Sequence, residues 1–335
     1  MIKTFLATLQ PMLTLFLCIA IGYILHKRKL LPENAGKVMA KLENWVFCPA
    51  LSFTTMARFC TVNTLSSHAV NITFSIILCS ISMAIAIPCS KLFVKEKVYE
   101  RGVYQYALAF GNIGYMGDPI VLSIFGDVGL SYYKMFTLPL SIAIYTWGIS
   151  VLVPHDQKSG NSFKNLLNPP MIASFLGIFV GLVGLGGVGG FMDTKLPFLM
   201  NTLDSLKTSM GPVAMLLAGF TIASYDLKTM LKKKKVYVAT FLRLIVLPIT
   251  LISLLFIVKL LASALFSLQI SNNVLFLSFI ATAVPLGLNT VVFPEAYGGN
   301  PETGAAMATI SHTLCIITIP ILFAIMTALF GAPTF

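Results

Sequence analysis

Long apolar runs joined by short polar loops are the feature of this sequence that most restricts its fold. Residues 5–25 and 302–330 are typical, and each is long enough to cross a bilayer as a helix, which takes about 20 residues. Hydrophobic residues make up 57% of the chain and charged residues only 10%, whereas soluble domains carry about 25% charged residues. The sequence therefore predicts an all-α polytopic protein of the cell membrane, surrounded by the lipid bilayer.

Ten apolar segments are candidate membrane-spanning helices, and a polar stretch divides them five and five. The candidates are residues 5–25, 35–57, 69–91, 103–126, 131–153, 170–190, 197–223, 236–262, 273–296 and 302–330. We therefore expect a first five-helix unit over residues 1–153, a cytoplasmic linker over residues 154–168 and a second five-helix unit over residues 169–335.

The distribution of basic residues indicates the orientation of the chain. Most of the 23 Lys and Arg residues lie in or beside the loops that follow the first, third, fifth and seventh candidate spans. Cytoplasmic loops carry such an excess, so both termini are expected outside the cytoplasm. This placement explains the net charge of +11 without nucleic-acid binding. Arg243 and Lys259 fall inside the span 236–262, and their side chains are expected to reach towards opposite membrane faces.

The two halves of the chain share a weak series of matching positions. Pro11-Met12 begins an apolar span in the first half as Pro170-Met171 does in the second. An odd number of spans in each half would insert the halves with opposite topology. Inverted repeats are typical of secondary transporters, whose substrate sites lie where interrupted helices meet in the membrane. A chance recurrence of prolines is the alternative.

The fourth candidate span contains a stretch that cannot remain a regular helix. Between Gly111 and Ile120 it has three glycines, an asparagine and the pair Asp118-Pro119. Proline lacks a backbone donor, and it pushes the residue before it out of the α region. Inside a bilayer such a break is tolerated only where protein or a wet cavity surrounds it. The candidate substrate-binding residues here are Asn112, Gly114, Met116, Gly117, Asp118 and Pro119.

The ninth candidate span carries a corresponding break, with the candidate binding residues Pro285, Gly287, Asn289 and Thr290. Two such breaks would leave the N-termini of half-helices inside the membrane, where free N–H groups and positive dipole ends favour an anion. No Lys or Arg lies near the middle of either segment, so we expect an anion site without a basic side chain. A pair of ordinary proline kinks is the alternative.

These motifs resemble the auxin efflux carrier family, which includes bacterial malate and other organic-acid permeases. In the first half the resemblance rests on Asn112, Gly117 and Pro119. In the second half it rests on residues 284–293, Tyr297-Gly298-Gly299-Asn300, Ser311 and Thr318-Ile319-Pro320. It covers essentially the whole chain.

The resemblance implies a fold and a mechanism. Ten helices would form two inverted five-helix repeats with broken, crossing helices 4 and 9, similar to the bile acid:sodium symporter and sodium–proton antiporter folds. Helices 1, 2, 6 and 7 would form a scaffold, and helices 3–5 and 8–10 a transport domain that moves by an elevator mechanism. Asn112 would contact a substrate carboxylate, and the family is compatible with a homodimer.

Three residues depart from the family pattern. Asp118 stands where the family usually has an apolar or aromatic residue, and Thr290 where plant members carry the proline of the second break. His312 follows Ser311 where many bacterial members have threonine. These departures favour the bacterial organic-acid branch over the plant substrate.

Asp118 and His312 are the candidate residues for ion coupling. A carboxylate near the middle of a span is costly and calls for a reason. Asp118 either caps a half-helix that has Pro119 at its first position, or takes up a proton or a cation. His312 either packs with a hydrogen bond inside its helix or relays a proton.

The sequence as a whole predicts a secondary active transporter of small organic anions, with malate-like mono- or dicarboxylates ahead of auxin-like ones. The alternative is a cation-coupled exchanger of the sodium–proton antiporter type, although such proteins usually pair two intramembrane carboxylates and only Asp118 is evident. An enzyme is not expected, because the apolar segments hold no HExxH motif and no paired carboxylates. We expect no cofactor and no metal site, with coupling to H⁺ or Na⁺ left open.

Overall fold

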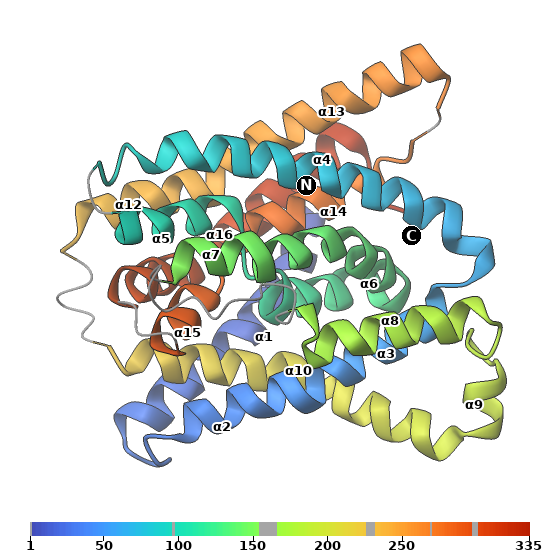
Figure 1. The fold of residues 1–335 in the computed structure, drawn as a ribbon, viewed down its shortest axis with the longest axis horizontal. Helices are drawn as coiled ribbons and strands as arrows, with labels where there is room; N and C mark the ends of the chain where they lie inside the picture. Colours follow the sequence, from blue (N-terminus) through green and yellow to red (C-terminus); the bar gives the residue numbers. More distant parts are fainter. Residues whose placement is uncertain (1, 96–97, 154–165, 226–231, 269, 297–300) are drawn as a thin grey trace.

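A computed structural model describes residues 2–95, 98–153, 166–225, 232–268, 270–296 and 301–335. Every regular element in these ranges is a helix, and the isolated antiparallel bridge between Gly111 and Leu286 is the one β contact among them. The expected all-α protein is therefore confirmed. Figure 1 shows the long helices packed side by side.

The first half of the chain forms three long helices and one interrupted helical segment. Its elements are α1 (Ile2–Lys27), α2 (Ala35–Leu42), η1 (Glu43–Phe47), α3 (Cys48–Phe59), η2 (Val62–Thr64), α4 (Leu65–Ser90), α5 (Val98–Ala109), η3 (Ile113–Gly117), α6 (Asp118–Ala143), η4 (Ile144–Gly148) and α7 (Ile149–Leu152). The π-turn η1 joins α2 and α3 into one helix, and the π-turn η3 runs directly into α6. Inside α6 the helix bends at Gly126, whose φ of 67° lies in a region that favours glycine.

The second half contains a similar mixture of continuous and interrupted helices. Its elements are α8 (Pro169–Leu182), α9 (Phe191–Lys195), α10 (Pro197–Ala223), α12 (Lys234–Phe241), η7 (Leu242–Val246), α13 (Leu247–Phe266), α14 (Asn273–Ala283), α15 (Asn289–Ala296) and α16 (Glu302–Phe330). The π-turn η7 joins α12 and α13. Asn168 caps α8, because its Oδ1 accepts a hydrogen bond of 3.1 Å from the backbone N–H of Met171.

Six helical stretches among the described residues are long and apolar enough to cross a membrane. They are Thr8–Lys27, Val62–Ser90, Ile113–Leu152, Pro197–Ala223, Lys234–Phe266 and Glu302–Phe330. The third stretch divides at Gly126, and α8 and α14 are shorter apolar helices. These findings agree with a multi-pass membrane protein. Each of the ten predicted spans contains helix, but ten spans in an inverted repeat, and the orientation of the termini, remain predictions.

Two regions named in the sequence analysis lie outside the described residues. They are residues 154–165, which make up most of the predicted linker, and residues 297–300 of the second-half motif. The interpretation of both rests on the sequence alone.

Close backbone contacts bind the helices of the predicted scaffold together. α1 packs along α10, and α3 packs along α8 (Figure 1). A Cβ atom at Gly22 of α1 would lie 2.1 Å from the carbonyl oxygen of Leu216, and one at Gly219 of α10 would lie 1.9 Å from that of Ile19. Small residues permit such close approach of helices. The assignment of these helices to a rigid scaffold is not tested by their packing and stays a prediction.

The remaining helices enclose a core of large side chains beside this group. α4 packs against α5 and α6, and α13 packs against α14. Tyr106, Phe110, Tyr133 and Phe136 are among the largest fully buried side chains, and all four lie within or beside the interrupted segment of the first half. The interruptions are therefore enclosed by protein, as an intramembrane break requires.

Candidate functional site

The first predicted interruption lies between α5 and η3. α5 ends at Ala109, and helix resumes at Ile113 with the π-turn η3, which continues into α6. Asn112 has a non-helical backbone conformation (φ −79°, ψ 63°), and its carbonyl oxygen accepts hydrogen bonds from the N–H groups of Met116 at 3.2 Å and Gly117 at 2.9 Å. Asn112 therefore starts the second half-helix, six residues before Asp118 in the sequence.

The second interruption lies between α14 and α15. Val284 is extended (φ −60°, ψ 148°), as expected for the residue before Pro285. The carbonyl oxygen of Pro285 accepts a hydrogen bond of 2.8 Å from the N–H of Asn112, and the N–H of Leu286 donates to the Ser311 hydroxyl at 3.1 Å. The two interruptions thus meet, and each satisfies backbone groups that the other leaves open.

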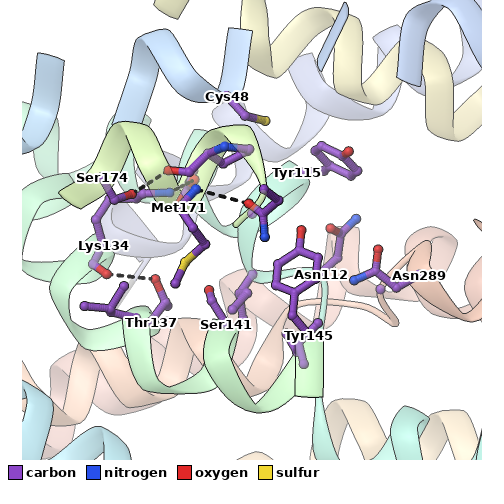
Figure 2. Close-up of a pocket in the computed structure, with 18 of the residues that line it drawn as sticks. Cys48, Asn112, Tyr115, Lys134, Thr137, Ser141, Tyr145, Met171, Ser174 and Asn289 are labelled. Carbon is purple, nitrogen blue, oxygen red and sulfur yellow. Dashed lines mark hydrogen bonds and ion pairs between the residues drawn. The ribbon is translucent and has the colours of Figure 1, made fainter. Parts of the chain in front are cut away.

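A cavity of about 110 Å³ opens beside this meeting point (Figure 2). That space holds several water molecules or a small carboxylate. The described residues that line it are Asn44, Cys48, Gly111, Asn112, Ile113, Gly114, Tyr115, Asp118, Lys134, Thr137, Leu138, Ser141, Ile144, Tyr145, Asn168, Pro170, Met171, Ser174, Gly287 and Asn289. They come from the two interruptions, from α6 with η4, and from the η1–α3 helix and α8 on the facing side.

Half of the predicted binding residues line the cavity. They are Asn112, Gly114, Asp118, Gly287 and Asn289. A side chain added at Gly114 would meet no atom within 4 Å, so the helix start faces open space there. Ile113, Gly114 and Tyr115 form the first turn of the half-helix, where backbone N–H groups have no acceptor within the helix. This turn can therefore offer donors to an anion in the cavity.

The other predicted residues lie behind the cavity wall. Met116 is buried in the core, and Gly117 packs against the hydroxyl of Tyr133. Pro119 contacts Gly211 of α10. These three residues shape the half-helix and its packing.

On the second interruption, Pro285 and Thr290 are likewise absent from the described lining. Thr290 is fully buried, and its hydroxyl donates to the carbonyl oxygen of Gly287 at 2.8 Å. Both residues hold the interruption in its conformation.

Asp118 forms an ion pair, and the helix cap that was one of its two predicted roles is not formed. Its Oδ2 lies 3.1 Å from Nζ of Lys134, while its backbone is helical and it makes no capping bond to the start of the helix. Only 2% of Asp118 is exposed, and its Oδ1 has no partner among the described residues. The expectation of a site without a basic side chain is wrong for the lining of this cavity, because Lys134 reaches it from the other half of α6.

Asn112 and His312 form a buried hydrogen-bonded pair. Nδ1 of His312 lies 2.8 Å from the carbonyl oxygen of Ala308, which can only accept, so Nδ1 carries the proton. Nε2 of the neutral ring then accepts from the Asn112 amide nitrogen, 3.4 Å away. His312 does not belong to the described lining of the cavity; it orients a residue that does.

Asn289 is oriented by a similar arrangement on the second interruption. Its amide nitrogen donates to the hydroxyl of the fully buried Tyr106 at 3.0 Å. Figure 2 shows Asn112 and Asn289 on the same side of the cavity, close to Tyr145. Two amide side chains, one from each interruption, therefore flank the same space.

Two further charged residues lie near the cavity, and the sequence analysis missed their role. Arg243 is only 1% exposed, so the expectation that its side chain reaches towards a membrane face is wrong. Glu43 in η1 is fully buried and accepts from the thiol of Cys48 at 3.5 Å. A charged residue within an apolar span was the available signal for both. Among the described residues, no group of three or more His, Cys, Asp or Glu side chains could hold a metal ion.

Comparisons with known proteins agree on one class. The membrane transport protein family matches residues 7–162 and 161–323. An uncharacterized transporter of Methanocaldococcus jannaschii is 23% identical over 322 residues, which cover 93% of this chain and 96% of the relative. An uncharacterized transporter of Methanothermobacter thermautotrophicus is 24% identical over 213 residues, which cover 59% of this chain and 68% of the relative.

Proposed function

Because the chain belongs to the membrane transport protein family, the family of the auxin efflux carriers, we propose that it is a secondary active transporter of small organic anions. The substrates we favour are mono- or dicarboxylates such as malate, as in the bacterial organic-acid branch of the family. The observation that carries this proposal is the meeting of two interrupted helices beside a polar cavity. Such meeting points hold the substrate in transporters built on broken helices.

The substrate carboxylate binds at the start of η3 in this proposal. The first-turn N–H groups of Ile113, Gly114 and Tyr115 and the positive end of the helix dipole attract it. The side-chain amides of Asn112 and Asn289 add hydrogen bonds from the two interruptions. Each amide already has one partner, His312 or Tyr106, so both are held in place before the substrate arrives.

An elevator movement is the transport mechanism that we propose. The cavity lies between the η1–α3 helix and α8 on one side and the interrupted helices with α6 on the other. A substrate held there touches both groups, so sliding one group past the other would carry it across the membrane. Both termini outside the cytoplasm, and assembly as a homodimer, belong to the same proposal.

A cation-coupled exchanger is the second candidate, and one observation favours it. Asp118 is not the only buried carboxylate, since Glu43 is also fully buried. Glu43, Lys134 and Asp118 all lie close enough to Cys48 to act on it electrostatically. Two carboxylates near one cavity are the pattern that an exchanger of protons or sodium ions would use. In the carrier proposed first, the same residues would couple anion transport to H⁺ or Na⁺.

Uptake by proteoliposomes separates these candidates. Purified protein is reconstituted, and uptake of labelled malate is measured with and without imposed pH or sodium gradients. The carrier predicts uptake above that of empty vesicles and loss of uptake in Asn112→Ala. Cation exchange without any carboxylate uptake or binding, across a panel of mono- and dicarboxylates, would contradict it and support the exchanger.

A further inference from the structure

Arg243 carries a buried charge that has no acidic partner among the described residues. It lies in the π-turn η7 between α12 and α13, and only 1% of it is exposed. One long hydrogen bond of 3.5 Å joins its Nη2 to the carbonyl oxygen of Val284. Its Nε and Nη1 have no hydrogen-bond partner in the described structure. An unpaired charge inside a membrane protein is costly, and such residues generally mark a function.

The guanidinium lies against both helix interruptions. Val284, whose carbonyl oxygen accepts from the guanidinium, begins the second interruption. On the first, a Cβ atom at Gly111 would come within 2.2 Å of Nη2, so any other residue at this position would force the guanidinium to move. Gly111 lines the cavity, whereas Arg243 is not among its described lining residues. The guanidinium therefore lies behind the cavity wall, and the backbone of Gly111 separates it from the cavity.

Two tyrosines enclose the charge without neutralising it. Tyr106 and Tyr133 are both fully buried and close enough to Arg243 to interact with it electrostatically. Tyr106 also accepts from Asn289, and Tyr133 donates to the carbonyl oxygen of Ile113 at 3.3 Å. Both tyrosines connect the arginine to residues that line the cavity.

The other charged residues around the cavity do not neutralise the positive charge of Arg243. Lys134 is paired with Asp118. Glu43 lies in η1, on the opposite side of the cavity, and accepts a hydrogen bond from the thiol of Cys48. At the interruptions themselves the positive charge of Arg243 is thus uncompensated, and an anion in the cavity would balance it.

We propose that Arg243 is a specificity-determining residue that selects anions, and dicarboxylates over monocarboxylates, by its charge acting through Gly111. The inference deepens the proposed function and rests on it. Charges interact more strongly across a buried layer than in water. Each negative charge on the ligand therefore gains affinity from Arg243, although no ligand atom needs to touch the guanidinium.

Binding of two ligands that differ by one charge tests the proposal. We measure the affinities of malate and of its monomethyl ester for purified wild type, Arg243→Gln and Arg243→Lys. With an interaction worth about tenfold per ligand charge, Arg243→Gln should weaken malate binding about 100-fold and ester binding about tenfold. Arg243→Lys keeps the charge and should stay within about threefold of wild type for both ligands.

Lys259→Gln is the matched control, because it removes one positive charge from the same helix. Lys259 bonds to Asn272, away from the interruptions, so both affinities should stay unchanged. Arg243→Met serves as a second variant if Arg243→Gln does not fold, since apolar residues commonly replace buried charged ones without loss of the fold. It should show the same charge-dependent loss.

Equal losses for both ligands, without rescue by lysine, would assign Arg243 a packing role and overturn the inference. Unchanged affinities in Arg243→Gln or Arg243→Met would overturn it as well, while wild-type malate binding would leave the proposed function intact. If the wild type binds neither ligand, the malate-like function itself fails, and the role of Arg243 fails with it.

Discussion

The two helix interruptions meet at one point but differ in the residues that they contribute to the cavity. Residues 111–118 at the first supply six residues of the cavity lining, including Asp118 with its ion pair to Lys134. The second supplies Gly287 and Asn289, and no charged residue lies between Val284 and Asn289. Two hydrogen bonds stabilise its backbone instead, one from the Leu286 N–H to the Ser311 hydroxyl and one from the Thr290 hydroxyl to the carbonyl oxygen of Gly287.

The first interruption contributes most of the groups that can bind a ligand, whereas the second mainly supports the first. The first interruption exposes a helix start, an amide and a carboxylate to the cavity, so it can respond to a charged ligand. The second holds that helix start in place, because its Pro285 carbonyl accepts from Asn112. We therefore expect substitutions at the first interruption to weaken substrate binding most, and substitutions at the second, apart from Asn289, chiefly to lower stability.

The largest expected effect is that of Asn112→Ala on substrate binding. Loss of an amide that bonds a carboxylate should weaken malate binding about 100-fold, since hydrogen bonds to charged groups are the stronger kind. Asn289→Ala is the matched control on the second interruption and should cost about tenfold or less. Equal effects in binding assays of the two variants would contradict the division between the interruptions.

The Asp118–Lys134 pair should give the next largest effect. Asp118→Asn leaves Lys134 without its partner in a site where the lysine is only 17% exposed. Breaking a well-buried pair costs about 3–5 kcal/mol, and partial exposure of Lys134 reduces our expectation to about 2 kcal/mol. Thermal unfolding of both single variants and of the double variant Asp118→Asn/Lys134→Gln measures this loss. The double variant should recover much of it, and additive losses would show that the pair is not coupled.

Ser311→Ala should destabilise the protein while leaving the affinity for malate within about twofold of wild type. The substitution leaves the buried N–H of Leu286 without its acceptor, which costs about 1–2 kcal/mol. Thr309→Ala is the control, because the Thr309 hydroxyl donates to the carbonyl oxygen of Ala305 within the same helix and has no other bond among the described residues. A large loss of affinity in Ser311→Ala without loss of stability would make the second interruption a recognition element too.

A charge pair distant from both interruptions should give the smallest effect. Burial would raise the pKa of the Asp193 carboxyl, but hydrogen bonds from Arg58 and the N–H of Gly189 outweigh it and lower that pKa. The carboxylate therefore stabilises the folded state above the unfolded pKa of about 3.9, and this contribution is lost as the pH falls below that value. Asp193→Asn should cost about 1 kcal/mol or less at neutral pH, and this cost should shrink as the pH falls through the lowered pKa of Asp193. A loss that does not depend on pH would exclude the charge as its cause.

The positions of the helices and of both interruptions were predictable, because they follow from local chemistry. Apolar length places a span, and glycine, asparagine and proline together break it, as at Asn112 and Pro285. The helix cap, one of the two roles predicted for Asp118, is not formed because the half-helix starts at Asn112, and the aspartate instead pairs with Lys134. A local sequence pattern cannot indicate which distant side chain offers the better partner.

The facing wall of the cavity and the buried Arg243 could not be predicted, for the same reason. Cys48 and Ser174 reach the cavity only because α3 packs along α8 beside the first interruption. The side chain of Arg243 was expected to reach towards a membrane face because long basic side chains inside a span commonly do so. Its place against Gly111 depends on how α12 and α13 pack in three dimensions.

A structure determined by electron cryomicroscopy with a saturating dicarboxylate tests the central claim most directly. The account predicts ligand density in the cavity beside the meeting point, with one carboxylate within hydrogen-bonding distance of Asn112 and the N–H groups of Ile113 to Tyr115. Density bound away from both interruptions, for example in the apolar groove between α13 and α16, would contradict it.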